Sequence, residues 1–158
     1  KRLDPGNKFI KTMKNGKIGL AENEGKGRLM EPQFDEMPLA IYGHRWPAYK
    51  KIGSDHLFFV RNAGEPLRCI GDEGQLLFPF EMTEVWKDGF GRIRYKNGAL
   101  TGIFIPHSPY ALIPPIYESL EVVENLPQRI GMGFLIFKVR KNVLYVFFGI
   151  NGVEYFRE

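Results

Sequence analysis

The feature that most constrains the fold is a tight turn that recurs between two apolar runs. It occurs four times, at Asn15-Gly16, Ala63-Gly64, Asn97-Gly98 and Lys141-Asn142. Asn-Gly is the strongest short signal for a β-hairpin, because both central positions of a type I′ turn need positive φ. No window of a dozen residues shows helical spacing of apolar positions, and 18 glycines and 11 prolines are spread along the chain. The sequence therefore predicts an all-β fold.

A second turn follows each of these turns about ten residues later, so each unit contains three short strands. We expect the strands at 8–13, 18–22 and 28–31, at 57–61, 67–70 and 75–78, at 91–95, 101–105 and 110–113, and at 134–139, 143–148 and 153–157. Internal repeats of this length are typical of solenoids and propellers, because a three-stranded sheet cannot bury its own face.

We therefore predict about twelve short antiparallel strands in four hairpin-plus-strand repeat units. The units form a propeller-like or solenoid-like array, and the pattern does not choose between these two. Together they make a single β-repeat domain over 1–158, with units at approximately 8–37, 57–85, 90–121 and 134–158.

Three units end in a segment that combines proline with aromatic and acidic residues, at 31–36 (EPQFDE), 78–81 (FPFE) and 114–119 (PPIYES). Proline fixes φ and has no backbone N–H, so it suits an edge strand. We expect a short helical turn after this closure, around 117–123.

The first and third units resemble the WG repeat, a β-repeat of mostly bacterial proteins. The resemblance rests on NGKIGL at 15–20 with EPQFDE at 31–36, and on Asn97-Gly98, GIFI at 102–105 and IPPIYE at 113–118. Ile18 stands where the repeat has its naming tryptophan, and the second and fourth units lack the glycine that follows it. The resemblance implies a β-rich interaction scaffold and transfers no catalytic residue.

Composition narrows the class of protein. With 158 residues, of which 44 % are hydrophobic, the chain is long and apolar enough for one ordered domain. A lone cysteine, Cys69, is typical of a cytoplasmic protein, and a periplasmic location is compatible with it. The start at Lys1 suggests a trimmed or mature chain, from which a signal peptide could have been removed. A formal net charge of +4 is too small to indicate nucleic acid and slightly favours an acidic partner.

The segment 41–51, IYGHRWPAYKK, is an insertion between the first two units and has the most unusual composition. Tyrosine, tryptophan and arginine are enriched at binding hot spots, and long insertions often carry function. We therefore expect a binding role for seven of its residues, Tyr42, His44, Arg45, Trp46, Tyr49, Lys50 and Lys51. The alternative is a loop whose Trp46 only covers the end of the core.

A second candidate lies at 86–96, where Arg92, Arg94 and Lys96 alternate with Ile93 and Tyr95. On a strand this pattern gives one basic face and one apolar face. We expect Trp86, Arg92 and Arg94 to bind an acidic partner or a phosphate backbone. The alternative is the ordinary solvent face of a half-buried strand.

Signals for catalysis are weak. None of the three histidines, His44, His56 and His107, lies at metal-ligand spacing from another histidine or from the cysteine. Alternation places Cys69 on a core face with Leu67, so it is not expected to be a reactive thiol. A glycosidase-type pair needs two carboxylates roughly 5–10 Å apart, which a sequence cannot reveal. We expect no catalytic residue, no metal and no cofactor.

Three hypotheses follow. The first is a non-enzymatic protein-binding module, and more sharply a bacterial immunity or inhibitor protein that neutralises a toxin by covering its active site. The second is a binder of nucleic acid or another polyanion that uses the same residues. The third is a hydrolase whose carboxylate pair forms only in the fold. The expected partner is another protein, a toxin domain in the sharper form, and no membrane is involved.

Overall fold

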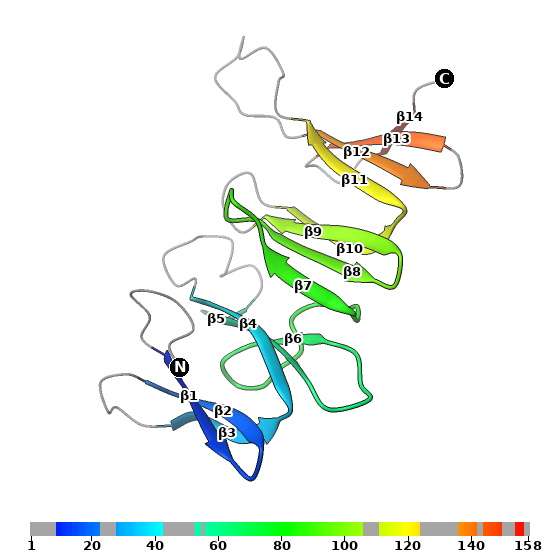
Figure 1. The fold of residues 1–158 in the computed structure, drawn as a ribbon. Coiled ribbons are helices and arrows are strands. Elements are labelled where there is room, and N and C mark those ends of the chain that lie inside the picture. The colour runs from blue at the N-terminus through cyan, green and yellow to red at the C-terminus, as the bar shows by residue number, and fades with distance from the viewer. Residues whose placement is uncertain are drawn as a thin grey trace. The chain divides into compact units, whose positions relative to one another are not determined.

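The computed structural model describes residues 9–22, 28–42, 53–54, 56–105, 111–123, 136–141, 144–149 and 154–156. These residues form fourteen strands and no helix, in four open antiparallel sheets (Figure 1). The predicted all-β class is confirmed. Within the described ranges, there is accordingly no helix that could cross a membrane.

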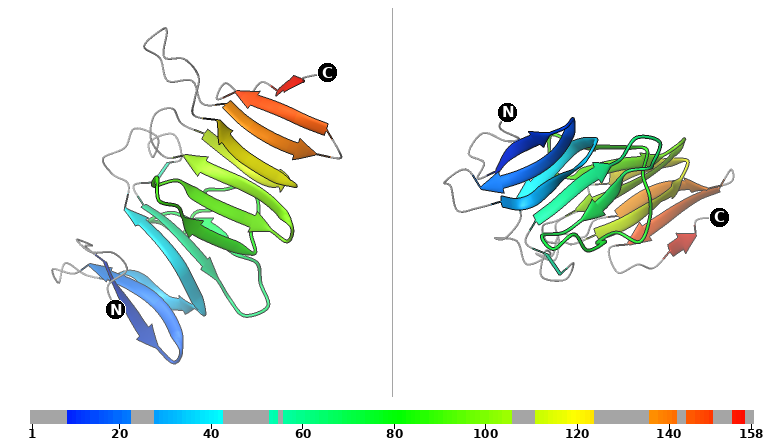
Figure 2. Two further views of the ribbon diagram at one scale, coloured as in Figure 1. Left: turned by 45° about the horizontal axis from the view of Figure 1, so that its top comes forward. Right: turned by 90° about the horizontal axis from the view of Figure 1, so that it is seen from below.

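Each sheet is a meander of strands that follow one another along the chain, as Figure 2 shows. The first sheet contains β1 (Phe9–Lys14), β2 (Lys17–Glu22) and β3 (Arg28–Phe34). The second contains β4 (Glu36–Tyr42), β5 (His56–Arg61) and β6 (Arg68–Ile70). The third contains β7 (Glu84–Lys87), β8 (Ile93–Asn97), β9 (Leu100–Ile105) and β10 (Ala111–Tyr117). The fourth contains β11 (Ser119–Val123), β12 (Ile136–Lys141), β13 (Leu144–Gly149) and β14 (Glu154–Phe156).

The chain divides into two compact units, Lys1–Glu81 and Met82–Glu158, each holding two of the sheets. In the first unit, one apolar cluster joins residues of both sheets, namely Leu20, Met30, Phe34, Met37, Phe58, Val60 and Ile70. The second unit has a corresponding cluster of Ile103, Ile105, Ala111, Ile113, Tyr117, Phe137 and Val139. Each unit thus buries one face of one sheet against the next, as short sheets require. The expectation of a single domain over 1–158 stays a prediction.

Two of the four predicted turns, Asn15-Gly16 and Ala63-Gly64, are confirmed in position, the third is shifted by one residue, and Lys141 of the fourth is paired with Leu144 in the ladder while Asn142 lies outside the described residues. Asn15 and Gly16 have φ values of 51° and 75°, as a type I′ turn requires. In the third sheet Asn97 pairs with Leu100, so the two-residue loop is Gly98-Ala99 and not Asn97-Gly98. Gly98, at φ 62°, takes the first central position, where a type II′ turn needs glycine.

Three strands were not expected from the sequence: β4, β7 and β11. Each follows a proline-containing segment and is the first strand of the next sheet. The helical turn expected around 117–123 is therefore wrong, because Ser119–Val123 forms β11. Leu120 and Val122 of that strand pack against the core of the unit and pair with Val139 and Phe137. At 75–78 a full strand was expected, but only an isolated bridge from Leu76 to Ile70 is formed.

The three transitions into these strands share one local structure. At each, the residue just before the new strand donates its backbone N–H to the carbonyl of the residue that faces the first residue of that strand. These bonds run from Asp35 to Arg61 (3.1 Å), from Thr83 to Lys96 (2.7 Å) and from Glu118 to Arg140 (2.9 Å). The closures after 31, 78 and 114 are therefore bends into the next sheet.

In both the first and the third sheet, a glycine packs closely against the backbone of a neighbouring strand that contains proline. A Cβ on Gly19 would lie 2.6 Å from the nitrogen of Pro32, and a Cβ on Gly102 would lie 2.7 Å from the carbonyl carbon of Pro114. The prolines lie in β3 and β10, which are edge strands with register irregularities, as predicted for proline. Only glycine allows this close backbone approach.

Candidate binding surface

The hairpin that joins β7 to β8 is organised by one carboxylate. Asp88 Oδ1 accepts the backbone N–H groups of Phe90 (2.9 Å) and Arg92 (3.0 Å), and Oδ2 accepts Arg94 Nε (2.9 Å). The backbone of Asp88 closes the loop by donating to Arg92 O (2.9 Å) and accepting from Gly91 N (3.2 Å). Aspartate favours such turns because its side chain reaches the backbone two residues on. The loop is thus a defined structure that presents specific side chains.

Two aromatic rings are exposed on this hairpin, beside cationic groups. Phe90 is 67 % exposed and Trp86 is 38 % exposed. The Arg92 guanidinium lies 5.0 Å from the centre of the Phe90 ring, and the Lys96 ammonium lies 6.0 Å from the Trp86 ring. Both distances are in the range of cation–π attraction. We call these residues, together with Arg94, the aromatic–cationic surface.

The opposite face of β8 is apolar. Ile93 and Tyr95 are completely buried, and Tyr95 donates its hydroxyl hydrogen to Ile113 O at 2.5 Å. The predicted alternation of a basic and an apolar face over 92–96 is therefore confirmed. Cross-strand pairing sets Trp86 of β7 opposite Arg94 of β8, so these two residues share the basic face.

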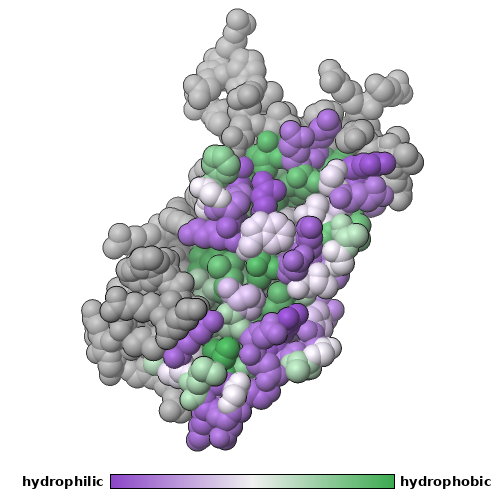
Figure 3. Space-filling view, viewed as in Figure 1, coloured by the Kyte–Doolittle hydropathy of each residue, from purple (hydrophilic) through white to green (hydrophobic). Residues whose placement is uncertain are grey.

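The hairpin carries more cationic than anionic side chains. Residues 84–96 carry four cationic and two anionic side chains. Burial raises the pKa of Asp88, but hydrogen bonds from Arg94 and from the backbone of Arg92 and Phe90 outweigh this, so its pKa lies below the ordinary value. Asp88 is therefore an anion at neutral pH that fixes Arg94 in place. On the face seen in Figure 3, hydrophilic residues surround smaller groups of hydrophobic ones.

The structure brings together one of the two candidate sets and describes little of the other. Trp86, Arg92 and Arg94 lie on one hairpin. Tyr42 is the last residue of β4, paired with His56, and Ile41 is buried in that strand, so neither belongs to an insertion loop as expected. The pairing of β4 with β5 extends the sheet to this point. Six further candidates lie outside the described residues: His44, Arg45, Trp46, Tyr49, Lys50 and Lys51.

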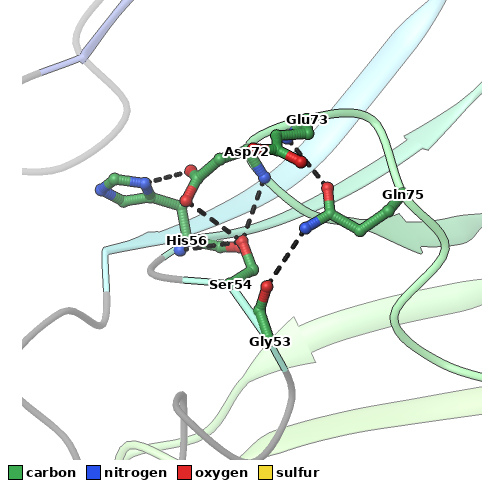
Figure 4. Close-up of polar contacts among 6 residues, drawn as sticks. All are labelled: Gly53, Ser54, His56, Asp72, Glu73 and Gln75. Atoms are coloured by element: carbon green, nitrogen blue, oxygen red, sulfur yellow. Dashed lines mark hydrogen bonds and ion pairs between the residues drawn. The ribbon is translucent and has the colours of Figure 1, made fainter.

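A second polar cluster precedes β5 and is shown in Figure 4. His56 Nδ1 contacts Asp72 Oδ1, and Ser54 Oγ lies 3.2 Å from Asp72 Oδ2 and accepts Asp72 N–H at 3.0 Å. Gln75 Nε2 donates to Gly53 O at 3.2 Å. Serine, histidine and aspartate are the residue types of a catalytic triad. Here, however, the Ser54 hydroxyl contacts Asp72 and donates to the backbone carbonyl of His56 (2.8 Å), not to its imidazole. This geometry fixes the loop after β6 to the residues before β5 and does not activate a nucleophile.

Other groups that could do chemistry have structural surroundings. Asp35 accepts Lys17 Nζ (2.7 Å) and Ala63 N–H (2.6 Å), and these two hydrogen bonds lower its pKa. Cys69 is buried with Leu67, as predicted, and burial raises the pKa of its thiol well above the ordinary value. Within the described part of the chain, no group of three histidine, cysteine or acidic residues could hold a metal ion.

Comparison with family models, with curated proteins and with solved structures found no match to this chain. No residue role is therefore carried over from a relative.

Sequence reasoning missed the residues that build the hairpin. Asp88 and Phe90 were not singled out, although Asp88-Gly89 is a recognised turn signal that could have indicated a side-chain–stabilised loop. The contact of His56 with Asp72 had no signal, because it depends on how the loop after β6 folds back on the start of β5.

Proposed function

We propose that this chain is a non-enzymatic protein-binding module and that the aromatic–cationic surface contacts its partner. The observation that supports the proposal most is the pair of exposed rings, Phe90 and Trp86, on a hairpin held by Asp88. Exposed aromatic side chains cost solubility, and tryptophan and arginine are the residues most enriched at binding hot spots. A preorganised loop also loses little entropy on binding.

The charge of the surface favours an acidic protein partner. Excess cations beside apolar rings accelerate encounter with an acidic patch, and the rings then contribute buried area. The carboxylates of Asp35 and Asp88 are engaged in hydrogen bonds that lower their pKa, so neither of these two suits the role of a general acid.

Two finer hypotheses belong to the same proposal. The four sheets form a propeller-like or solenoid-like array of WG-type repeats, supported by the backbone hydrogen bond repeated at Asp35, Thr83 and Glu118 and by the glycine–proline contacts of the first and third sheets. The partner is a toxin domain, which would make the chain a bacterial immunity or inhibitor protein of the cytoplasm. The capture experiment below tests this second hypothesis directly, because it identifies the partner.

The test is affinity capture from nuclease-treated lysate of the native host, followed by mass spectrometry. The baits are the wild type, a Trp86→Ser/Phe90→Ser double variant, and Leu76→Ser as a matched control. Leu76 is 61 % exposed in the other unit, so the control removes an exposed apolar side chain away from the aromatic–cationic surface. We expect one dominant protein on the wild type and the control, and about a tenfold lower recovery on the double variant.

Two outcomes would contradict the proposal. Equal recovery on the double variant would show that the partner binds a surface other than the aromatic–cationic surface. Capture from a parallel untreated lysate that is absent from the nuclease-treated one would favour nucleic acid, whose phosphate groups a basic strand also suits.

A further inference from the structure

We propose that β7 accepts an acidic, extended segment of the partner as a fifth strand of the sheet β10-β9-β8-β7. The inference rests on the proposed function and specifies how the partner binds. In the described part of the chain, β7 is the last strand of this four-stranded sheet. An edge strand has unpaired backbone groups that can continue the ladder, which is the basis of β-strand addition.

The register identifies the backbone groups available on the outer side of β7. Asp88 N–H bonds to Arg92 O, and hydrogen-bonded pairs of an antiparallel ladder alternate along it. Trp86 is therefore hydrogen-bonded with Arg94 toward β8, as the pairing of these two residues shows. Val85 and Lys87, on either side of Trp86, form the alternate pairs of the ladder, so their N–H and C=O groups point to the outer side.

The two edges of this sheet differ in exposure. No residue of β7 is buried, and three of its four residues are exposed. In β10, at the other edge, Ala111, Ile113 and Tyr117 are buried, and they contribute to the core of the unit. Edge strands are usually covered, shortened by bulges or guarded by charge. The pairing of β7 with β8 is regular from Glu84 to Lys87, without a bulge in the strand that would prevent pairing along its outer side.

Charge indicates the chemistry of the added strand. The Lys96 ammonium lies over the Trp86 ring and thus above β7, and Arg92 lies over Phe90 at the hairpin end. Glu84 is the one acidic residue of β7, at its other end. Acidic side chains of an added strand are therefore favoured on the basic face near Trp86 and the hairpin. Apolar side chains are favoured on the opposite face, where Val85 pairs with the buried Tyr95.

The experiment measures binding of a labelled peptide of alternating glutamate and valine to the intact chain by fluorescence anisotropy. A lysine–valine peptide of the same length is the matched probe. Val85→Pro removes an outward N–H and leaves the ladder to β8 intact, and Val85→Thr is its control. We expect the glutamate peptide to bind the wild type and Val85→Thr, and to lose about tenfold in affinity with Val85→Pro or when lysine replaces glutamate.

Amide hydrogen exchange on the wild type tests the same contact without a variant. Saturating glutamate peptide should slow the exchange of Val85 and Lys87 about tenfold and leave that of Trp86, already paired with Arg94, nearly unchanged. The inference is overturned if the glutamate peptide does not bind, if both peptides bind equally, or if the exchange of Val85 and Lys87 is unchanged. The capture experiment separates this inference from the proposed function. If the peptide or exchange results contradict strand addition while the Trp86→Ser/Phe90→Ser variant still captures less protein than the wild type, strand addition is wrong and the proposed function is unaffected.

Discussion

The close approach of Gly102 to β10 makes a sharp prediction for Gly102→Ala. An alanine Cβ would lie 2.5 Å from Tyr95 Cε2 and 2.7 Å from the carbonyl carbon of Pro114, and it would also overlap the carbonyl oxygen of Ile113. Carbon atoms in contact are normally about 3.5–4.0 Å apart. Two of these three neighbours are backbone groups of β10, which is anchored in the core by Ala111, Ile113 and Tyr117, so they cannot move without repacking. Gly102→Ala should therefore destabilise the unit Met82–Glu158 by about 1–3 kcal/mol, the usual cost of overpacking.

Thermal unfolding followed by circular dichroism measures this loss. Each kcal/mol lowers Tm by about 4–8 °C where 60–100 residues unfold together, and by about 2–4 °C where the whole chain does. Gly89→Ala is the matched control, because a Cβ there has nothing within 4 Å and its φ lies outside the left-handed region. The control should leave Tm unchanged or raise it slightly, since alanine restricts the unfolded chain. Equal Tm values for Gly102→Ala and Gly89→Ala would refute the close approach of these two strands.

Two further predictions concern the same unit. Tyr95→Phe removes the hydroxyl that donates to Ile113 O in the core, and we expect a loss of about 1–2 kcal/mol in urea unfolding; an unchanged midpoint would mean that the carbonyl has another donor. Asp88→Asn keeps an acceptor for the backbone but loses the charge that binds Arg94, at a cost of about 1–2 kcal/mol at pH 7. Because the folded pKa of Asp88 is lowered, its contribution is complete above the unfolded pKa of about 4 and is lost as pH falls through the folded value. The stability difference between wild type and variant should therefore shrink below about pH 4, and a difference that stays constant down to pH 2.5 would contradict the ion pair.

The sequence predicts those features that depend on neighbouring residues. Alternation gave the buried face of Ile93 and Tyr95, and Asn15-Gly16 gave a turn of the expected type. The first strand of each later sheet was missed, because its place depends on the strand it pairs with. In β11 the residues Leu120 and Val122 are strand-forming only through the apolar neighbours that β12 supplies, and their acidic neighbours weaken the local signal.

The candidate surface was predicted in part for the same reason. The basic stripe is a property of one strand and was visible in the alternating pattern. Its relation to Trp86 depends on the pairing of β7 with β8, and the exposure of Phe90 depends on the loop that Asp88 builds. Sequence reasoning therefore identified the cations but not the arrangement that sets aromatic rings beside them.

The position of the hairpin within the repeated pattern gives a reason for function to lie there. The bends at Asp35, Thr83 and Glu118 lead into β4, β7 and β11 by the same hydrogen bond, so the start of the second, third and fourth sheets is constant. The connection from that first strand to the second varies: it spans 43–55 after β4, 88–92 after β7 and 124–135 after β11. A constant framework with one variable connection allows that connection to change without loss of the sheets. The connection at 88–92 is the shortest of the three, and the hydrogen bonds of Asp88 to Phe90, Arg92 and Arg94 order it, so its aromatic and cationic side chains are presented in a defined arrangement.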